Sequence, residues 1–261
     1  MGVLNVTSDS FSDGGLYLDH DKAYERAQHL IEQGADLIDI GGESVQPGAK
    51  SISIDEELSR VIPVIERIRS TSDICISIDT CKALVMQEAL SAGANLINDI
   101  HALTGDGALS VAAHFDVPVC LMHMQGEPAS MQVNPHYTED VVDVINTFFQ
   151  ERITACIQAG IARERIILDP GFGFGKSVQH NLILMNRLSA FQQHNLPVLI
   201  GVSRKSTIGA ILKKTVSERL SGGLALAVFA ALQGVAMIRT HDVDETNQAL
   251  QMIDAVCRVE I

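Results

Sequence analysis

Eight short apolar runs recur along the chain of 261 residues, and each has a polar or charged residue at or near its end. An apolar run of this length is typical of a strand buried on both faces, because crossover helices cover both faces of a parallel sheet. A helical pattern of about 10–20 residues follows most of the runs. The runs lie at 3–5, 37–40, 76–79, 96–99, 119–123, 166–169, 198–203 and 237–241. Eight strand–helix units in a chain of this size predict one (β/α)8 TIM barrel, an α/β fold in which residues 1–261 form a single domain.

The expected helix boundaries support this alternation. Ser53 and Glu56 have the spacing of a capping box in front of an amphipathic helix. A last helix is expected over 243–257. Four other helical segments stop at a glycine, the residue type favoured just after a helix end, and they span 20–33, 82–92, 138–159 and 217–233.

The composition excludes several classes of protein. A net charge of −13 argues against nucleic-acid binding, because neutralising phosphates requires an excess of Lys and Arg. No apolar stretch approaches the ~18 residues of a membrane helix, and the first residues lack the charged and apolar regions of a signal peptide. Five cysteines without a C-x-x-C pair indicate core thiols in a reducing cytosol. We therefore expect a cytoplasmic protein that binds neither membranes nor nucleic acid.

Polar side chains lie at or near the ends of the apolar runs. In a TIM barrel the C-terminal strand ends form the active face, so these side chains should surround one mouth. Taken singly, each could instead be a strand-end cap or an ordinary ion pair. The predicted mouth residues are Asn5, Asp79, Asn98, Asp169, Lys205, Arg239 and His241.

The glycine-rich segment 168–177 resembles a nucleotide-binding loop only superficially. Pro170 stands where a P-loop requires its first glycine, and the spacing does not match the dinucleotide fingerprint either. We interpret the segment as a turn whose backbone can approach a flat ligand, with Phe174 as an aromatic wall. Two longer connections, 7–19 and 42–52, are either ordinary surface loops or lids that order over a substrate.

Seven motifs together resemble the dihydropteroate synthase family. They occur in the family's order and cover nearly the whole chain, at 5–15, 78–80, 97–100, 122–126, 168–176, 203–206 and 239–242. The resemblance implies a barrel fold and a transfer reaction of folate biosynthesis. In that reaction p-aminobenzoate displaces pyrophosphate from 6-hydroxymethyl-7,8-dihydropterin diphosphate, which yields 7,8-dihydropteroate.

The resemblance also implies how the site is divided. Asp169 would read the amide and amidine edge of the pterin beside Asn98, while Asp79 would stabilise positive charge as the C–O bond breaks. The implied catalytic residues are Asp79, Lys205, Arg239 and His241. The implied pterin contacts are Asp79, Asn98, Met122, Asp169, Phe174, Gly201 and Lys205.

Further groups are implied for the other substrate parts. Diphosphate would be bound by Asn5, Arg239, Thr240 and His241, with Asn5 also a ligand of Mg²⁺. The p-aminobenzoate pocket would comprise Pro47, Phe174, Lys205 and Ser206. The family further implies a homodimer and competition by sulfonamides at that pocket.

The chain departs from the family pattern at three places. Val45 and Gln46 stand where the family has Thr and Arg, Ser8 replaces a proline, and the chain starts directly on its first strand. Two lost diphosphate contacts predict impaired, not absent, turnover. Two alternatives therefore remain at this point: a methyltetrahydrofolate methyltransferase of the same superfamily, which needs no diphosphate clamp, and a pterin-binding relative without catalysis.

Overall fold

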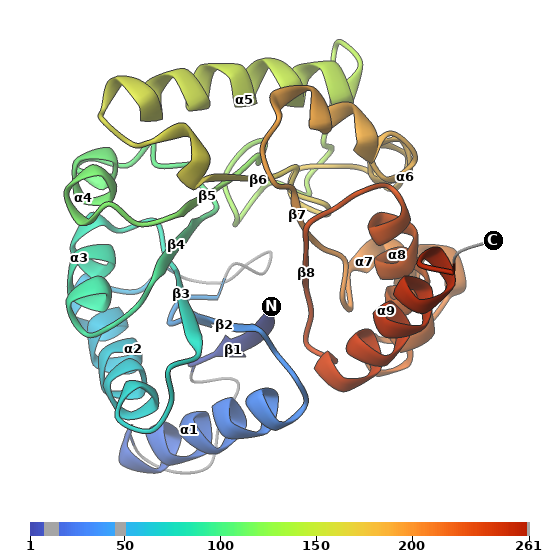
Figure 1. The fold of residues 1–261 in the computed structure, drawn as a ribbon. Helices are drawn as coiled ribbons and strands as arrows, with labels where there is room; N and C mark the ends of the chain where they lie inside the picture. Colours follow the sequence, from blue (N-terminus) through green and yellow to red (C-terminus); the bar gives the residue numbers. More distant parts are fainter. Residues whose placement is uncertain (8–15, 45–50, 260–261) are drawn as a thin grey trace.

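The structure is a computed structural model that describes residues 1–7, 16–44 and 51–259. Within these residues, parallel strands alternate with helices and close into a ring that the helices surround (Figure 1). The strands are β1 (Gly2–Asn5), β2 (Leu37–Gly41), β3 (Cys75–Asp79), β4 (Leu96–Asp99), β5 (Val119–Met122), β6 (Ile166–Asp169), β7 (Leu199–Gly201) and β8 (Met237–Arg239). Each strand falls on one of the predicted apolar runs, and the predicted TIM barrel is confirmed.

The ring consists of two hydrogen-bonded sheets. Strands β1 to β6 pair in chain order, and β7 pairs with β8. Single bridges, Leu168 to Val198 and Gly2 to Thr240, join the two sheets. At the second junction the amide of Val3 donates to the carbonyl of Thr240 at 3.0 Å. We call these junctions the β6–β7 seam and the β8–β1 seam.

The helices cover the outside of the barrel (Figure 1). They are α1 (Leu16–Glu32), α2 (Ile54–Arg69), α3 (Ala83–Ser91), α4 (Ala108–Phe115), α5 (Val141–Gln158), α6 (Val178–Asn186), α7 (Ser206–Leu212), α8 (Leu220–Leu232) and α9 (Val243–Cys257). Short 3₁₀ turns lie at Arg163–Arg165, Leu188–His194 and Val216–Glu218. None of the helices in the described part of the chain is long and apolar enough to cross a membrane.

The predicted helix ends are confirmed with four adjustments, the first being that α1 begins at Leu16, before the predicted residue 20. Gly34 follows α1 with φ +87°, and Ala35 N donates to Leu30 O at 3.0 Å, which closes the helix as expected. Ser53 caps α2, but Glu56 pairs with Arg60 at 2.5 Å instead of completing the capping box. Helix α5 starts later than predicted, where Asp140 caps it, and the segment 217–233 is divided into a 3₁₀ turn and α8.

Side chains alternate between the inside and the outside of the barrel along each strand, and this determines which residues form the site. The barrel interior contains a cluster of Leu96, Cys120, Ile167 and Leu199, with Met237 packed against it. Two residues further along, each strand returns to the same face. Those inward positions near the C-terminal ends are Asn98, Met122, Asp169, Gly201 and Arg239, so the hydrophobic floor and the polar mouth share one set of strands.

Candidate active site

Strand register brings the predicted residues to one rim. Asp79 is level with Asn98, Met122 with Asp169, and Gly201 with Arg239. Asn5 is level with Gly41, which is in turn level with Asp79. These residues therefore do lie at one end of the barrel, although the contacts among them could not be predicted from the sequence.

Arg239 lies at the centre of a buried charge cluster. Its Nε donates to Asp39 Oδ2 at 2.6 Å and its Nη2 to Asp79 Oδ2 at 2.7 Å. Asn98 Nδ2 also donates to Asp39 Oδ2, at 3.1 Å. A guanidinium carries five N–H donors, so Arg239 can hold both carboxylates and still donate to phosphate oxygens.

Asp39 is the site residue that sequence reasoning missed. It lies inside the apolar run 37–40 and not at its end, and it is completely buried. One of its oxygens, Oδ1, has no hydrogen-bond partner. A buried carboxylate costs free energy unless it is paired, so an aspartate in the middle of an apolar strand was itself a signal of a polar partner in the barrel.

The two mouth carboxylates have raised pKa values. Burial raises the pKa of Asp79, and the nearby charge of Asp39 raises it further, against the opposing effect of Arg239. Burial also raises the pKa of Asp169, while a hydrogen bond from Gly171 N at 2.8 Å and the charge of Lys205 oppose the rise. Both groups can therefore exchange a proton with a ligand more readily than exposed carboxylates do.

Lys205 and Phe174 form the next part of the rim. Lys205 Nζ lies 4.0 Å from the centroid of the Phe174 ring, a cation–π contact. Burial and the charge of Arg239 lower the pKa of Lys205 to about 8. Phe174 also belongs to an apolar cluster that includes Ile100 and Met122, so the mouth has one apolar wall beside its charged groups.

The glycine-rich segment lies closely against the β5–α5 connection. A Cβ at Gly171, where φ is +69°, would lie 1.9 Å from His123 O, and one at Gly175, where φ is +62°, would lie 2.2 Å from Gln125 O. The glycines are thus required for contact with the protein's own backbone. This is a different reason from the close ligand approach that the sequence indicated.

Lys176 ends this segment, and sequence reasoning assigned it no role. It is 2% exposed, and its Nζ lies 3.0 Å from both His123 Nδ1 and Phe174 O. Burial lowers its pKa to about 7. Burial and the charge of Lys176 lower the pKa of His123 to about 2, so His123 is a neutral core histidine. Lys176 therefore connects β5 to the loop that carries Phe174.

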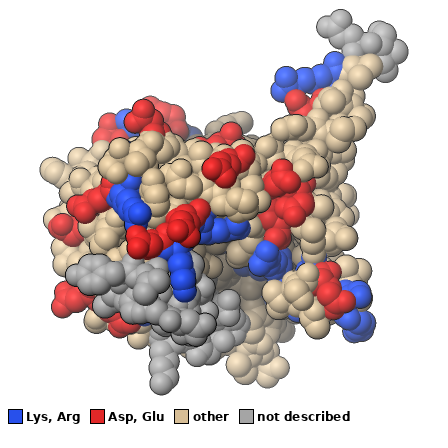
Figure 2. Space-filling model, turned by 90° about the horizontal axis from the view of Figure 1, so that it is seen from below, with Lys and Arg blue, Asp and Glu red and all other residues tan. Residues whose placement is uncertain are grey.

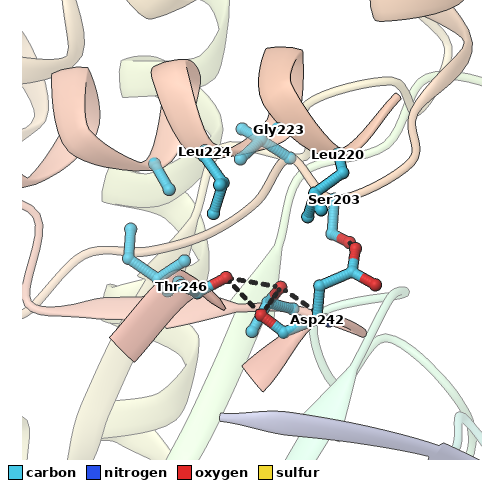
Figure 3. A pocket seen from close by; sticks show the side chains of 10 residues that line it. Ser203, Leu220, Gly223, Leu224, Asp242 and Thr246 are labelled. Carbon is cyan, nitrogen blue, oxygen red and sulfur yellow. Dashed lines mark hydrogen bonds between the residues drawn. The ribbon is translucent and has the colours of Figure 1, made fainter. Parts of the chain in front are cut away.

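The groups expected to bind diphosphate are arranged unequally. His241 is half-buried, and burial together with Arg239 lowers its pKa to about 4. Thr240 points elsewhere: its Oγ1 lies 3.0 Å from Thr246 Oγ1, in a small cavity between the barrel and α8 (Figure 3). The Thr240 hydroxyl is therefore turned away from the mouth, and a side-chain contact with diphosphate is not supported.

Part of the predicted site lies outside the described residues. Pro47, Val45, Gln46 and Ser8 fall in 8–15 and 45–50, so of the residues predicted for the p-aminobenzoate pocket the structure describes Phe174, Lys205 and Ser206. Asn5 is half-buried at the end of β1. In the described ranges no group of three or more His, Cys, Asp or Glu residues could hold a metal ion. A carboxamide oxygen at the mouth fits Mg²⁺ that is bound mainly by water and substrate phosphates.

The sequence and the fold were compared with those of known proteins. Residues 1–241 match the family described as pterin binding enzyme. The dihydropteroate synthase of Escherichia coli (strain K12) is 52% identical over 255 residues, which cover 98% of this chain and 90% of that protein.

Two solved structures are similar over nearly the full length. The Yersinia pestis dihydropteroate synthase with a sulfonamide drug has a TM-score of 0.94 at 49% identity, covering 99% of this chain and 94% of that one. The Xanthomonas albilineans dihydropteroate synthase with 4-aminobenzoic acid has a TM-score of 0.93 at 44% identity, covering 100% and 93%.

Proposed function

This chain belongs to the dihydropteroate synthases of the pterin binding enzyme family, and we propose on that premise how its barrel mouth performs the reaction. The reaction is a transfer in folate biosynthesis, in which 6-hydroxymethyl-7,8-dihydropterin diphosphate and p-aminobenzoate give 7,8-dihydropteroate and pyrophosphate. The assignment of residues rests on one observation: three carboxylates, a guanidinium and the half-buried Lys205 converge at one end of the barrel.

The carboxylates recognise the pterin. Asp169 accepts N–H bonds from the amide and amidine edge of the ring, and Asn98 supplies a donor and an acceptor beside it. Asp79 lies one strand away from Asn98 and faces the positive charge that develops as the C–O bond breaks. Because these groups are buried and fixed before the substrate arrives, their electrostatic effect is larger than in water.

Arg239 links the carboxylates of the pterin site to the diphosphate. Its bonds to Asp39 and Asp79 fix the guanidinium plane, and its remaining N–H groups bind the oxygens of the departing diphosphate. His241 completes the diphosphate site from the same strand end. Asn5 would hold Mg²⁺, which when bound neutralises phosphate charge as pyrophosphate leaves.

The amine substrate lies between Phe174, Lys205 and Ser206, with Pro47 from the second loop. Lys205 is held over Phe174 at 4.0 Å, which places its Nζ beside the aromatic wall. Sulfonamides are expected to compete for this pocket. The Yersinia pestis relative with a sulfonamide drug supports this expectation.

A turnover assay tests the function. Purified protein would receive the dihydropterin diphosphate, p-aminobenzoate and Mg²⁺, and dihydropteroate and pyrophosphate would be measured together. We expect both products, with losses of roughly 10- to 100-fold in Asp79→Ala and Lys205→Ala, since each removes a charge-assisted contact. Pterin binding without either product would instead indicate the relative that lacks catalysis.

We also propose a homodimer built on α8 and α9. Helix α8 is apolar on all sides, a pattern typical of buried helices, yet only Ala227 and Ala230 are buried in the single chain. Phe229 is 39% and Leu232 57% exposed. The end of α9, which projects from the body of the molecule, exposes Met252 and Val256 (Figure 2). A second copy of the chain would bury this face.

Surface charge and free cysteines bear on the partners and the cellular location of the protein. In the view of Figure 2, acidic and basic side chains are interspersed over the surface, which agrees with a small-molecule enzyme and not with a nucleic-acid surface. All five cysteines have free thiols. We place the protein in the cytoplasm, where such thiols stay reduced.

A further inference from the structure

Three residues at the ends of β7 and β8 form a hydrogen-bonded relay. Ser203 Oγ lies 3.1 Å from the ring nitrogen Nδ1 of His241 and 3.3 Å from the backbone N of His241. The same oxygen lies 3.3 Å from Asp242 Oδ2. Figure 3 shows the Ser203 hydroxyl beside the Asp242 carboxylate, at the edge of the cavity that Leu220, Gly223 and Leu224 line.

Asp242 is ionised in this relay. Burial alone would raise its pKa, but the hydrogen bond and charge of Arg204 outweigh burial and lower it. Arg204 pairs with both oxygens of Asp242. Arg204 also adopts the left-handed backbone conformation, with φ +59°, while Arg219 Nη1 donates to its carbonyl at 2.9 Å. An unfavourable backbone conformation persists only where the surroundings enforce it.

The donors and acceptors around Ser203 Oγ indicate how its hydroxyl is oriented. An ionised carboxylate only accepts hydrogen bonds, and the Ser203 hydroxyl lies in position to donate its single proton to Asp242 Oδ2. The two lone pairs of Ser203 Oγ are left to accept, one from the backbone N–H of His241 and one from its ring. His241 must therefore carry a proton on Nδ1, which leaves Nε2 as the nitrogen available to a ligand.

We propose that Ser203 and Asp242 are positioning residues that fix His241 in the Nδ1–H form and present its Nε2 to the diphosphate. A single proton from solvent, shared between Nε2 and a phosphate oxygen, completes the contact. The inference rests on the proposed function, since it assigns His241 to the leaving group of that reaction.

The charges around His241 agree with this role. Arg239 from β8, and Arg204 and Lys205 from the β7–α7 connection, surround it with positive charge, which Asp242 partly offsets. Arg26 from α1 donates to the His241 carbonyl at 2.9 Å. These cations disfavour a charged imidazole in the free enzyme, whereas an arriving diphosphate favours the added proton.

The tautomer can be measured directly in the wild-type protein. With ¹⁵N-labelled histidine at pH 7.5, and His241→Gln to assign the signals, Nδ1 of His241 should show the shift of a protonated nitrogen and Nε2 that of an unprotonated one. Ser203→Ala should mix the two forms. A wild-type His241 protonated on Nε2 alone would overturn the proposal.

Binding of inorganic pyrophosphate gives a second test that needs no turnover. Ser203→Ala and Asp242→Asn should weaken pyrophosphate binding by roughly threefold to tenfold, the effect of one lost hydrogen bond. The KM for the dihydropterin diphosphate should rise by a similar factor and that for p-aminobenzoate should not. Ser203→Thr, which keeps the hydroxyl, should restore binding.

Thr246→Val is the matched control, because its hydroxyl lies in the same cavity but donates to the backbone carbonyl of Asp242, not to the carboxylate or to His241. Its pyrophosphate affinity should equal that of the wild type. Equal affinities for Ser203→Ala and the wild type would also overturn the proposal. A wild-type protein that binds pyrophosphate but makes no product would count against the proposed function and leave the relay intact.

Discussion

At the scale of single residues, the departures from the family pattern are the first matter to test. Val45 and Gln46 replace a hydroxyl and a cation that the family pattern assigns to the diphosphate. Restoring both groups through Val45→Thr together with Gln46→Arg should raise kcat/KM by roughly tens to hundreds of fold, because a neutral and a charge-assisted hydrogen bond are gained. Steady-state kinetics would measure this gain. Val45→Ala with Gln46→Ala should give none, and an unchanged rate on restoration would refute the explanation.

Asp39 offers a pH-dependent prediction. Burial raises the pKa of Asp79 to about 7 with the help of the Asp39 charge, so Asp39→Asn should leave Asp79 ionised at lower pH. If catalysis needs ionised Asp79, the acid limb of kcat/KM against pH moves to lower pH. The plateau rate should fall by about 10-fold, since Arg239 loses a charge-assisted bond. The exposed Asp36→Asn variant should keep the wild-type profile, and an unmoved limb in Asp39→Asn would exclude this coupling.

The same residue shows where sequence reasoning stops. Asp79, Asn98 and Asp169 were found because they close apolar runs, and strand ends are where barrel chemistry lies. Asp39 does not close a run, so that rule passed over it. Thr240 was assigned with its neighbours Arg239 and His241, but side chains alternate along a strand and its hydroxyl points to the other face.

At the scale of elements, run length predicted every strand, because a strand buried on both faces has no other sequence pattern. A glycine just after the helical pattern correctly predicted the ends of four helices. Helices α4 and α6 are followed by Asp116 and Arg187, not by glycine, so that rule could not bound them. The glycine-rich loop does follow β6 as predicted, yet its reason, contact with 123–125, depends on tertiary packing.

Lys176 links that loop to β5, and its burial predicts a pH dependence of stability. Burial lowers its pKa from 10.5 to about 7. Between these values the unfolded chain binds a proton that the folded chain does not, so this residue makes the free energy of unfolding rise with pH. That contribution, up to about 1.4 kcal/mol per pH unit, should vanish in Lys176→Met.

Urea unfolding of both proteins at several pH values between 7 and 10.5 would measure the difference. The exposed Lys213→Met variant is the control and should follow the wild type, since its side chain lies in water in the folded protein as well. Parallel pH curves for Lys176→Met and the wild type would show that Lys176 keeps its charge in the folded state.

At the scale of the whole molecule, the exposed face of α8 predicts an assembly. Leu232→Glu should convert the proposed homodimer to monomer, because a charge would enter an apolar interface. Ile157→Glu on α5, where the apolar side chain is 46% exposed, should not. Light scattering after gel filtration would measure both masses. A monomeric wild type would remove the dimer from the proposal.

The β6–β7 seam and the β8–β1 seam separate two sheets, and the proposed contacts to the substrate come from both of them. Of the proposed contacts, Asp79, Asn98 and Asp169 for the pterin belong to the six-stranded sheet, whereas Arg239 and His241 for the diphosphate lie at the end of β8 in the two-stranded one. On these proposed roles the intact substrate would add one more link across the β8–β1 seam, beside the bonds of Arg239 to Asp39 and Asp79. Breaking the C–O bond would remove that link, so each product would be bound mainly by one of the two sheets.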